Sequence, residues 1–405
     1  MINNGLTSFK GRRVLLLQGP IGSFFSRLSC DLKHAGVEAV FKINFNGGDF
    51  AFYPRNSVQY RGQPEDWPAF FKKFVLEHQI DLIFLFGDCR PAHKIVHPIA
   101  EELAIEVGVF EEGYIRPNYI TLERYGVNGY SQLPKLPEFY KLHAAGRLPK
   151  ADPVGNTYWH MVRQTMLYYL AAFVIKPFFW TYEHHRPLNL LEAWPWVKGV
   201  WRKQFYRIKE RGIQERLTGD LFKKYFFVPL QVHNDSQILS HSQFDTVGEF
   251  IEKTINSFAK HAPSDTYLVI KHHPMDRGYY DYTRLIKNLV GEGELKSRVF
   301  YIHDQHLPSL LNAAFGVVVV NSTVGLSAVQ RHLPVFVEGD SIYKISEITY
   351  IGEIDDFWGI AHAFEPNKEI VAGFLKYLIQ TTQLNGSFYR GDVNYVNERL
   401  PSQVK

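Results

Sequence analysis

Short apolar runs recur along the first 115 residues, and each is followed by a loop of glycine or polar residues. The runs occupy residues 14–18, 39–45, 81–86 and 105–110. They are continuous rather than alternating, which is typical of strands buried on both faces of a parallel sheet. The segment 24–34, after the first run, is predicted to be a helix. The N-terminal part of the chain is therefore predicted to be an α/β domain.

The same pattern returns in the second half of the chain, where helix-length segments again separate the apolar runs. We expect a second α/β domain there. In open parallel sheets the ligand binds beyond the carboxyl ends of the strands, so polar residues that follow the runs are the first candidates for a functional site. The runs of this half are 225–231, 267–271, 299–302, 316–320 and 334–337.

Composition sets the class of protein. With 405 residues, 45% of them hydrophobic and 21% charged, the chain is expected to be globular and to form two domains. The two cysteines, Cys30 and Cys89, are too few for a disulfide framework or a cysteine-rich metal site. The N-terminal residues show no apolar stretch ahead of a cleavage site, so we expect a cytoplasmic location. The net charge of +4 is too small to indicate nucleic acid binding.

The stretch 158–216 differs from the rest because it holds five of the seven tryptophans and a surplus of basic residues. Aromatic rings interleaved with cations suit a membrane interface. Its longest apolar part, 167–180, contains Lys176 and Pro177 and is shorter than the roughly 20 apolar residues that span a bilayer. The stretch is expected to lie on a membrane without crossing it, or to form a helical hairpin whose aromatic residues pack between domains. Nucleic acid binding is a third alternative, without a supporting motif.

Two adjacent acids, Glu111 and Glu112, follow the apolar run that ends at Phe110. Neighbouring carboxylates and burial both raise the pKa of a carboxyl group, so one of the pair is a candidate for proton transfer or nucleophilic attack. Solvated loop residues or helix caps are the alternative. Nearby Arg116 supplies a cation for an anionic substrate. Another strand end of this domain carries Asp88, Arg90 and His93.

In the second domain, Lys271, His273 and Pro274 close the run 267–271, and such cationic and imidazole groups suit a phosphate or phosphodiester. After the run 316–320, backbone amides and hydroxyl groups at a predicted helix start form an anion pocket, and simple N-capping by Ser322 or Thr323 is compatible with it. The polar residues expected to face the same cleft are Asn321, Ser322, Thr323, Asn234, Ser236 and Gln237.

Metal binding is not expected. Neighbours in a strand point to opposite faces, so His272 and His273 would not share an ion. His303 and Asp304 form another possible cluster, but we expect Asp304 to cap the helix that begins at Leu307. The chain lacks the P-loop, GxGxxG, HExxH, GxSxG and Asp-x-Asp signatures. A metal-independent cleft between two α/β domains is the class that remains.

Five motifs stand at or near the ends of the predicted strands: FGDCRP at 86–91, FEEGY at 110–114, NDSQ at 234–237, KHHP at 271–274 and NST at 321–323. Taken in this order, they resemble the KpsS/LipB family of capsule polysaccharide proteins over nearly the whole chain. More broadly, they are similar to those of bacterial GT-B glycosyltransferases that use CMP-activated acidic sugars. The resemblance implies a GT-B-like fold, with two Rossmann-like domains facing a central cleft and a helical aromatic and basic insertion between them.

The family resemblance also implies an activity. It indicates a retaining transferase that takes β-Kdo from CMP-Kdo and begins the poly-Kdo linker on a phosphatidylglycerol-type lipid, without metal or cofactor, at the cytoplasmic face of the inner membrane. Glu112 falls where relatives have the nucleophile. In those relatives the residue is often Asp, which is one methylene shorter than Glu, so Glu111 and Asp88 remain alternative candidates for the nucleophile. Arg116 or Arg90, with His93 nearby, would bind the sugar carboxylate or the acceptor. The residues implied for CMP are His273, Ser322 and Thr323, supported by Lys271, Pro274, Asn321, Asn234, Ser236 and Gln237.

These inferences divide the chain into four parts. Residues 1–150 form the acceptor and catalytic domain, 151–220 the linker, 221–365 the CMP-sugar domain, and 366–405 a C-terminal helix and tail that packs back on the N-terminal domain. Two other functions stay open. One is a non-catalytic assembly or export factor that binds the glycolipid, with other capsule biosynthesis or export proteins as partners. The other is a metal-dependent phosphohydrolase using His272, His273, His303 and Asp304.

Overall fold

A computed structural model describes residues 3–182 and 193–396, and the chain divides into two compact units. Unit 1 comprises Met1–Leu133, Arg147–Asn189 and Lys376–Lys405, and unit 2 comprises Pro134–Gly146 and Leu190–Leu375. The aromatic and basic stretch, expected as one linking element, is thus shared between the units. Of the predicted segments, 183–192 and 397–405 lie outside the described residues.

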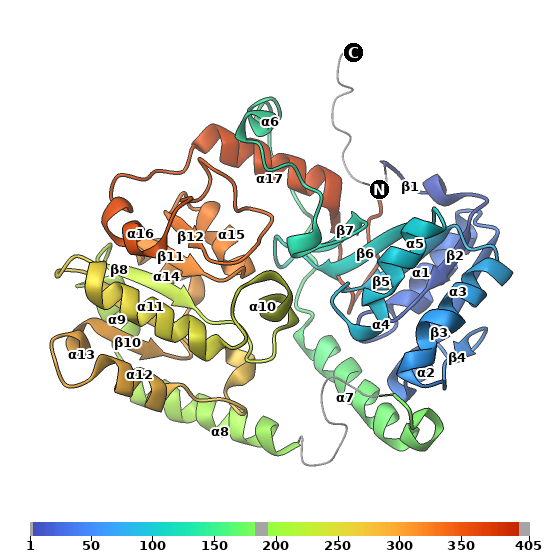
Figure 1. The fold of residues 1–405 in the computed structure, drawn as a ribbon, viewed down its shortest axis with the longest axis horizontal. Helices are drawn as coiled ribbons and strands as arrows, with labels where there is room; N and C mark the ends of the chain where they lie inside the picture. Colours follow the sequence, from blue (N-terminus) through green and yellow to red (C-terminus); the bar gives the residue numbers. More distant parts are fainter. Residues whose placement is uncertain (1–2, 183–192, 397–405) are drawn as a thin grey trace. The chain divides into compact units, whose positions relative to one another are not determined.

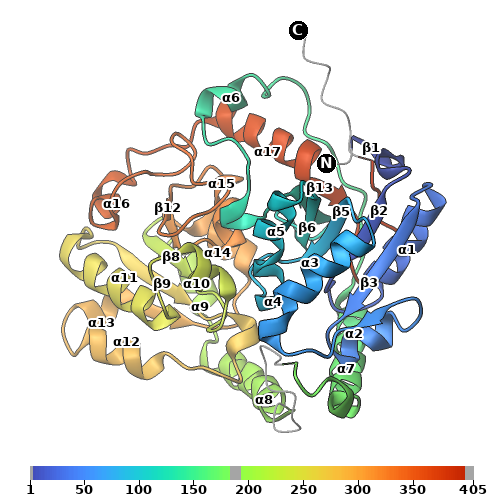
Figure 2. The same ribbon diagram turned by 45° about the vertical axis from the view of Figure 1, so that its right-hand side comes forward.

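Unit 1 is built on a seven-stranded sheet in the order β13-β7-β6-β5-β2-β3-β4. Five consecutive strands of this sheet, β6, β5, β2, β3 and β4, are parallel to one another. At the other edge, β7 and β13 are antiparallel to their neighbours (Figures 1 and 2). In chain order the parallel strands follow the Rossmann pattern. The bounds are β2 Arg13–Leu16, β3 Ala39–Asn44, β4 Val58–Gln59, β5 Leu82–Phe86, β6 Glu106–Glu112, β7 Tyr119–Arg124 and β13 Gln383–Asn385.

Helices cover both faces of this sheet. Helix α1 (Phe24–His34) buries Phe24 and Leu28 against one face, and α3 (Trp67–Glu77) and α5 (Val96–Glu102) bury Phe71 and Ala100 against the other. Burial on both faces explains the continuous apolar runs of the strands. The remaining elements are β1 Asn3–Leu6, η1 Thr7–Phe9, α2 Gly47–Phe52, η2 Pro64–Asp66, α4 Pro91–Lys94, η3 Asn128–Tyr130, α7 Tyr158–Val174 and η4 Lys176–Phe179.

Strand β6 is longer than the sequence predicts. The apolar run suggests an end at Phe110, but β6 continues to Glu112 because the antiparallel strand β7 pairs beside it, with Glu111 opposite Thr121 and Glu112 opposite Ile120. The two acids therefore lie within the last residues of a strand and not in the loop after it. Their side chains consequently follow the alternation of the pleat.

Unit 2 contains a five-stranded, fully parallel sheet in the order β10-β9-β8-β11-β12. This is again the Rossmann order, so the predicted α/β class with two Rossmann-like domains is confirmed. Strands β9 and β10 coincide with the predicted runs. The bounds are β8 Tyr225–Pro229, β9 Tyr267–Lys271, β10 Val299–Ile302, β11 Gly316–Val319 and β12 Val335–Val337.

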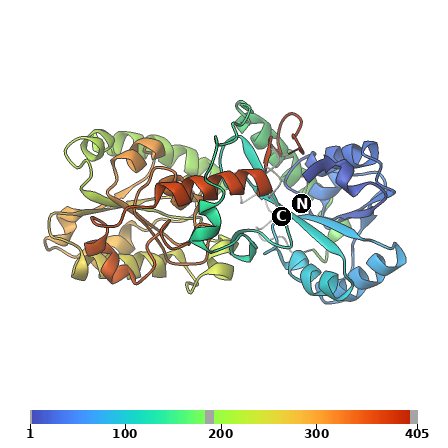
Figure 3. The ribbon, with the colours of Figure 1, turned by 90° about the horizontal axis from the view of Figure 1, so that it is seen from above.

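Helices lie on both faces of the second sheet as well (Figure 3). Helices α11 (Val247–His261) and α16 (Ile354–Ile360) bury Phe250, Phe258 and Trp358 in one core cluster with Phe226. The other helices of this unit are α6 Pro137–Lys141, α8 Ala193–Lys209, α9 Ile213–Thr218, α10 Ser236–His241, η6 Pro274–Asp276, α12 Thr283–Val290, α13 Leu295–Arg298, α14 Leu307–Ala313 and α15 Thr323–Val329. Helix α17 (Lys368–Thr382) begins in unit 2 and ends in unit 1.

Candidate functional site

The paired glutamates of unit 1 point to opposite faces of β6. Glu112 Oε1 accepts a hydrogen bond of 2.9 Å from the Tyr389 hydroxyl group, in the C-terminal segment that packs with α1. Glu111 lies on the other face, beside Gly87, and its Oε1 accepts a hydrogen bond of 2.9 Å from the Glu112 amide. Both carboxyl groups are thus fixed at the carboxyl end of the strand, where parallel sheets bind their ligands.

Burial changes the acidity of Glu111. Loss of hydration raises the pKa of this carboxyl group from its ordinary 4.5 to about 7, and the neighbouring charge of Glu112 raises it further, while the Glu112 amide and Arg90 oppose the rise. A carboxyl group with a pKa near 7 exchanges its proton readily at physiological pH. Glu111 therefore has the acidity expected of a general acid or base.

Tyr389 is a residue that the sequence analysis missed. Burial, followed by the charge of Glu112, raises the pKa of its phenol well above the ordinary value, so it remains a hydrogen-bond donor to Glu112. No local motif marks Tyr389, which is far from Glu112 in the sequence. It reaches Glu112 because β13 pairs with β7 and brings the C-terminal segment into unit 1.

Asp88 and His93 hold the loop after β5. Asp88 is 1% exposed, and its Oδ2 accepts a hydrogen bond of 2.9 Å from the Val127 amide. The His93 Nδ1 lies 2.6 Å from the Gly87 carbonyl oxygen, and burial lowers the pKa of the imidazole to about 3, so the ring is neutral and donates this bond. Gly87 has a φ of +66°, which favours glycine at this turn. The contacts of Asp88 and His93 are those of residues that shape the loop.

The two arginines named as candidates differ in exposure. Arg90 is partly buried, and its Nη1 donates to the Gly19 carbonyl oxygen at 3.2 Å, across the two strands at the centre of the sheet. Arg116 is exposed, and its Nε donates to the Gly113 carbonyl oxygen at 3.2 Å. The contact with Gly113 places the Arg116 guanidinium next to the strand end that carries Glu112.

In unit 2 the candidates meet where β8 and β11 lie side by side, the point at which the strand order reverses. Asn321, after β11, accepts on Oδ1 a hydrogen bond of 2.9 Å from Gln231 Nε2, after β8. Its Nδ2 donates to the Gln237 carbonyl oxygen at 2.9 Å. Such a switch point is where open α/β sheets bind their ligands. Gln231 was missed as a site residue, although it is the last residue of a predicted strand.

Ser322 caps α15 directly after this point. Its Oγ accepts a hydrogen bond of 3.2 Å from the Val324 amide, which confirms the predicted N-cap, and Thr323 is the first residue of the helix. The Tyr343 hydroxyl donates to the Ser322 carbonyl oxygen. Asp235, rather than a predicted candidate, caps α10 by accepting from the Gln237 amide at 3.0 Å. Asn234 is exposed, and the side chain of Ser236 lies outside the described residues.

The KHHP motif ends β9. Lys271 is buried, and loss of hydration lowers the pKa of its amine, while the charge of Asp304 opposes that effect. His273 Nδ1 accepts a hydrogen bond of 3.2 Å from the Met275 amide, and Pro274 begins η6. Asp276, which is fully buried, accepts hydrogen bonds from His233, a further residue that the sequence analysis did not select.

The prediction that Asp304 caps the helix beginning at Leu307 is wrong. Helix α14 has His306 at its N-cap without a side-chain bond, and Asp304 instead forms an ion pair of 3.2 Å with Arg277. The neighbouring His303 binds Glu210 through Nδ1 at 2.6 Å, and His272 Nδ1 lies 2.7 Å from the Tyr301 hydroxyl group. Within residues 3–182 and 193–396, no three His, Cys, Asp or Glu side chains gather in a way that could hold a metal ion.

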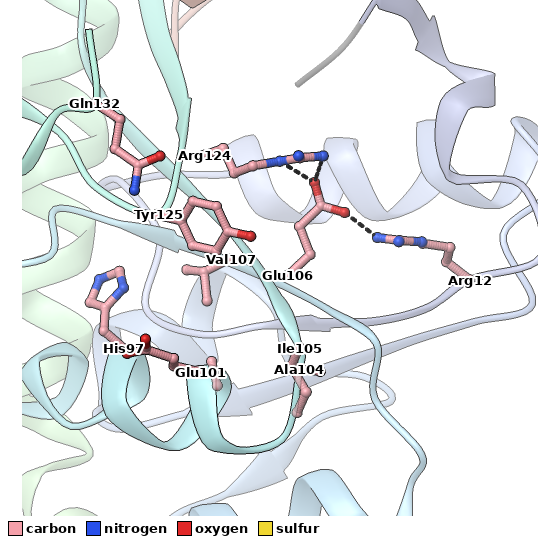
Figure 4. A pocket seen from close by; sticks show the side chains of 11 residues that line it. Arg12, His97, Glu101, Ala104, Ile105, Glu106, Val107, Arg124, Tyr125 and Gln132 are labelled. Carbon is pink, nitrogen blue, oxygen red and sulfur yellow. Dashed lines mark hydrogen bonds and ion pairs between the residues drawn. The ribbon is translucent and has the colours of Figure 1, made fainter. Parts of the chain in front are cut away.

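A pocket of about 600 Å³ lies at the opposite end of the first sheet (Figure 4). There Glu106, the first residue of β6, forms ion pairs with Arg12 and Arg124. None of the predicted site residues that the structure describes lines this pocket. The candidate chemistry is therefore at the carboxyl ends of the strands, away from this hollow.

Comparison with known proteins assigns the family. A family model described as capsule polysaccharide biosynthesis protein matches residues 81–389. The chain belongs to this family. The chain is also similar to the capsule polysaccharide export protein KpsS of Escherichia coli, with 39% identity over 96% of this chain and 100% of that protein. The capsule polysaccharide modification protein LipB of Neisseria meningitidis serogroup B is 40% identical, over 93% of this chain and 91% of its own.

Among solved structures, the chain is similar to the β-Kdo 2,7 transferase of Thermosulfurimonas dismutans KpsC, with a TM-score of 0.42 and 15% identity over 92% of both chains. Within the described residues of this capsule polysaccharide family member, no helix is both long enough and apolar enough to cross a bilayer.

Proposed function

We propose that this family member transfers β-Kdo from CMP-Kdo to a phosphatidylglycerol or lysophosphatidylglycerol acceptor, as the first step of the poly-Kdo linker of a capsular polysaccharide. The reaction retains the configuration of the sugar and needs no metal. It takes place at the cytoplasmic face of the inner membrane, where the lipid acceptor is available. The names of the relatives, which concern capsule polysaccharide export and modification, support a role in this pathway.

The position of Glu112 and its hydrogen bond to Tyr389 are the main support for this proposal. Glu112 is a carboxylate at the carboxyl end of a parallel strand, oriented by a phenol that stays protonated. In the first step, a Glu112 oxygen forms a bond to the anomeric carbon, and the bond from that carbon to the phosphate oxygen breaks, which releases CMP. In the second step, the acceptor hydroxyl oxygen displaces Glu112. The hydroxyl proton passes through water around the end of β6 to Glu111, whose pKa is about 7 and whose side chain lies on the other face of the strand.

The remaining substrate groups follow from charge. We assign the CMP portion to the switch point of unit 2, where Asn321, Ser322 and Thr323 present amide and hydroxyl groups, with His273 and Lys271 at the neighbouring strand ends. The Kdo carboxylate is assigned to Arg116, whose guanidinium is exposed beside Gly113. Asp88 and His93 keep the loop between β5 and α4 in shape.

The test is mass spectrometry of a fluorescent lysophosphatidylglycerol incubated with CMP-Kdo and the protein, without added metal. We expect a mass gain of one Kdo that Glu112→Ala and His273→Ala each abolish. Both variants are compared with Glu77→Ala, which removes an exposed acid from α3. Binding of the glycolipid without any mass gain, retained in both variants, would instead favour the non-catalytic export factor. Activity that EDTA removes would contradict the metal-independent reaction.

A further inference from the structure

Helix α8 packs on the rest of unit 2 through one face. Arg202 Nη1 donates to the Arg277 carbonyl oxygen at 2.8 Å, and its Nη2 pairs with Asp281 at 3.1 Å. Tyr206, one turn further, stacks on His303 with ring centroids 3.4 Å apart. A side chain at Gly278 would place its Cβ 1.8 Å from the Pro195 carbonyl oxygen, so the helix and the segment after β9 are in close backbone contact.

The opposite face of α8 is apolar and open to solvent. Trp201 is 65% exposed and Ile208 is 76% exposed. Residues spaced by three, four and seven positions share one side of a helix, so five of the seven exposed large apolar side chains of α8 form one continuous line, and Trp196 and Val200 lie beside it. We call this line the α8 stripe; its members are Trp194, Val197, Trp201, Phe205 and Ile208.

The charge next to the α8 stripe has one sign. Helix α8 contains five basic residues and no acidic residue, although the whole chain is nearly balanced, with 45 Lys plus Arg against 41 Asp plus Glu. Arg202 is engaged in the contact with unit 2. Lys209 lies over the ring of Phe205, at 5.6 Å from its centroid. The basic residues left for an external partner are Lys198, Lys203, Arg207 and Lys209.

Helix α7 of unit 1 has the same two-sided construction. Its inner face contributes Gln164, which donates to the Tyr389 carbonyl oxygen at 3.1 Å, and Tyr168, which donates to Asp49 at 3.2 Å. Its outer face is largely apolar, with the exposed Arg163 among the apolar residues, and Trp159 is 73% exposed. We call this outer face the α7 stripe; its members are Trp159, Met166, Leu167, Leu170, Phe173 and Val174. The helix contains no acidic residue.

We infer that the α7 and α8 stripes bind the surface of an anionic lipid bilayer, one stripe from each unit. Apolar stripes on otherwise packed helices, rich in tryptophan and bordered by cations, suit the boundary between acyl chains and headgroups. The positive sign of α8 matches anionic headgroups. This inference rests on the proposed function, because a lipid acceptor has to be met at a membrane surface. It also links that surface to the candidate site. The inner face of α7 contacts the segment that carries Tyr389, and the inner face of α8 contacts the segment that follows the KHHP motif.

The two stripes are expected to contribute differently. The four available cations of α8 make its binding sensitive to lipid charge and to salt. Helix α7 has only Arg163 and His160 as basic residues, so its binding depends mainly on burial of apolar surface. Removal of either stripe should therefore weaken binding, but only changes in α8 should remove the preference for anionic lipid.

Flotation of the full chain with vesicles tests the inference. One set of vesicles is phosphatidylcholine alone, and the other is phosphatidylcholine and phosphatidylserine in equal parts, so that neither contains the proposed acceptor lipid. We expect partition into the anionic vesicles to fall about tenfold or more for each stripe variant, and to vanish when the two are combined. The variants are Trp194→Ser with Trp201→Ser and Ile208→Ser, and Trp159→Ser with Met166→Ser and Leu170→Ser.

Matched controls separate the stripes from general effects. Leu76→Ser with Leu142→Ser and Ile351→Ser removes equally exposed apolar residues elsewhere and should bind like the unaltered chain. Neutralising Lys198, Lys203, Arg207 and Lys209 to Gln should make binding equal for both vesicles, whereas the same change at Lys224, Lys260, Arg284 and Lys287 should not. Circular dichroism melting verifies that each variant is folded.

Two results would overturn the inference. The first is the absence of vesicle binding by the unaltered chain; self-association that the stripe variants abolish would then assign the stripes to contacts between copies. The second is vesicle binding that the combined stripe variant retains. Neither result depends on sugar transfer, so a chain that binds vesicles but transfers no Kdo would contradict only the proposed function.

Discussion

The two units share a strand order but not a chemistry. In both, five parallel strands follow the Rossmann order, and candidate residues lie at the carboxyl ends. Unit 1 places carboxyl groups there, Glu111 and Glu112, whereas unit 2 places amide, hydroxyl, amine and imidazole groups. The first set suits attack on a carbon centre and proton transfer, and the second suits binding of a phosphate. The shared topology therefore determines where each site lies, and the residues that follow each strand determine the chemistry of that site.

The units also differ in how their sites are assembled. In unit 2 the contacts of Asn321 join strands of one sheet, β8 and β11, to the start of α10. In unit 1 the carboxylate of Glu112 is held by Tyr389, nearly 280 positions away in sequence, because β7 and β13 add an antiparallel edge to the sheet. The acidic site therefore depends on the C-terminal segment, and the phosphate-type site does not.

The largest expected effect separates chemistry from donor binding. Glu112→Ala removes the nucleophile, so the transfer rate should fall about a thousandfold or more. CMP affinity, assigned to unit 2, should stay unchanged. The rate is measured with the fluorescent lipid acceptor and the affinity by calorimetry. Unchanged transfer would move the nucleophile to Glu111 or Asp88 and would remove the contrast between the units.

A pH experiment tests the burial of Glu111. The fold raises its pKa from 4.5 to about 7, so folding favours the protonated form. The associated stability is fully present below pH 4.5 and is lost as the pH rises through about 7. Glu111→Gln should therefore be more stable than the unaltered chain at pH 8, with a smaller difference at pH 5, in urea unfolding. Equal pH dependence of both chains would show that Glu111 is not buried as a carboxylic acid.

A smaller effect is expected at the switch point of unit 2. Asn321→Ala removes the side-chain bonds to Gln231 and Gln237, and should weaken CMP binding about tenfold, since each such bond contributes about 1 kcal/mol. Calorimetric titration with CMP measures the change. Asn288→Ala, on the exposed side of α12, is the control and should bind CMP normally. If Asn321→Ala binds CMP as tightly as the unaltered chain, the nucleotide does not occupy this point.

The smallest expected effect concerns the cap of α15. Ser322→Ala removes the bond to the Val324 amide and should lower the free energy of unfolding by about 1 kcal/mol. Ser322→Thr retains an accepting hydroxyl group and should restore most of this loss. Urea unfolding monitored by circular dichroism gives both values. If Ser322→Ala loses more free energy of CMP binding than free energy of unfolding, the Ser322 hydroxyl group also contacts the donor.

Local patterns were sufficient for much of this molecule. Runs of apolar residues predicted the strands because a strand covered on both faces must be apolar along its length. Helix α1 has the predicted bounds, and Ser322 caps α15 as expected. The family resemblance carried by the motifs at the strand ends agrees with the match to residues 81–389.

Tertiary structure alone decided the remaining points. The length of β6, and hence the opposite directions of Glu111 and Glu112, depends on the pairing with β7. The pairing of Tyr389 with Glu112 and of Asp304 with Arg277 joins residues with no common local pattern. From the sequence, the aromatic stretch was equally consistent with membrane contact and with packing between domains. The structure shows which of its side chains are open to solvent, namely the stripes of α7 and α8. Hydrophobic periodicity is a property of neighbours along the chain, whereas hydrogen-bond partners and exposure are set by whatever distant segment packs alongside.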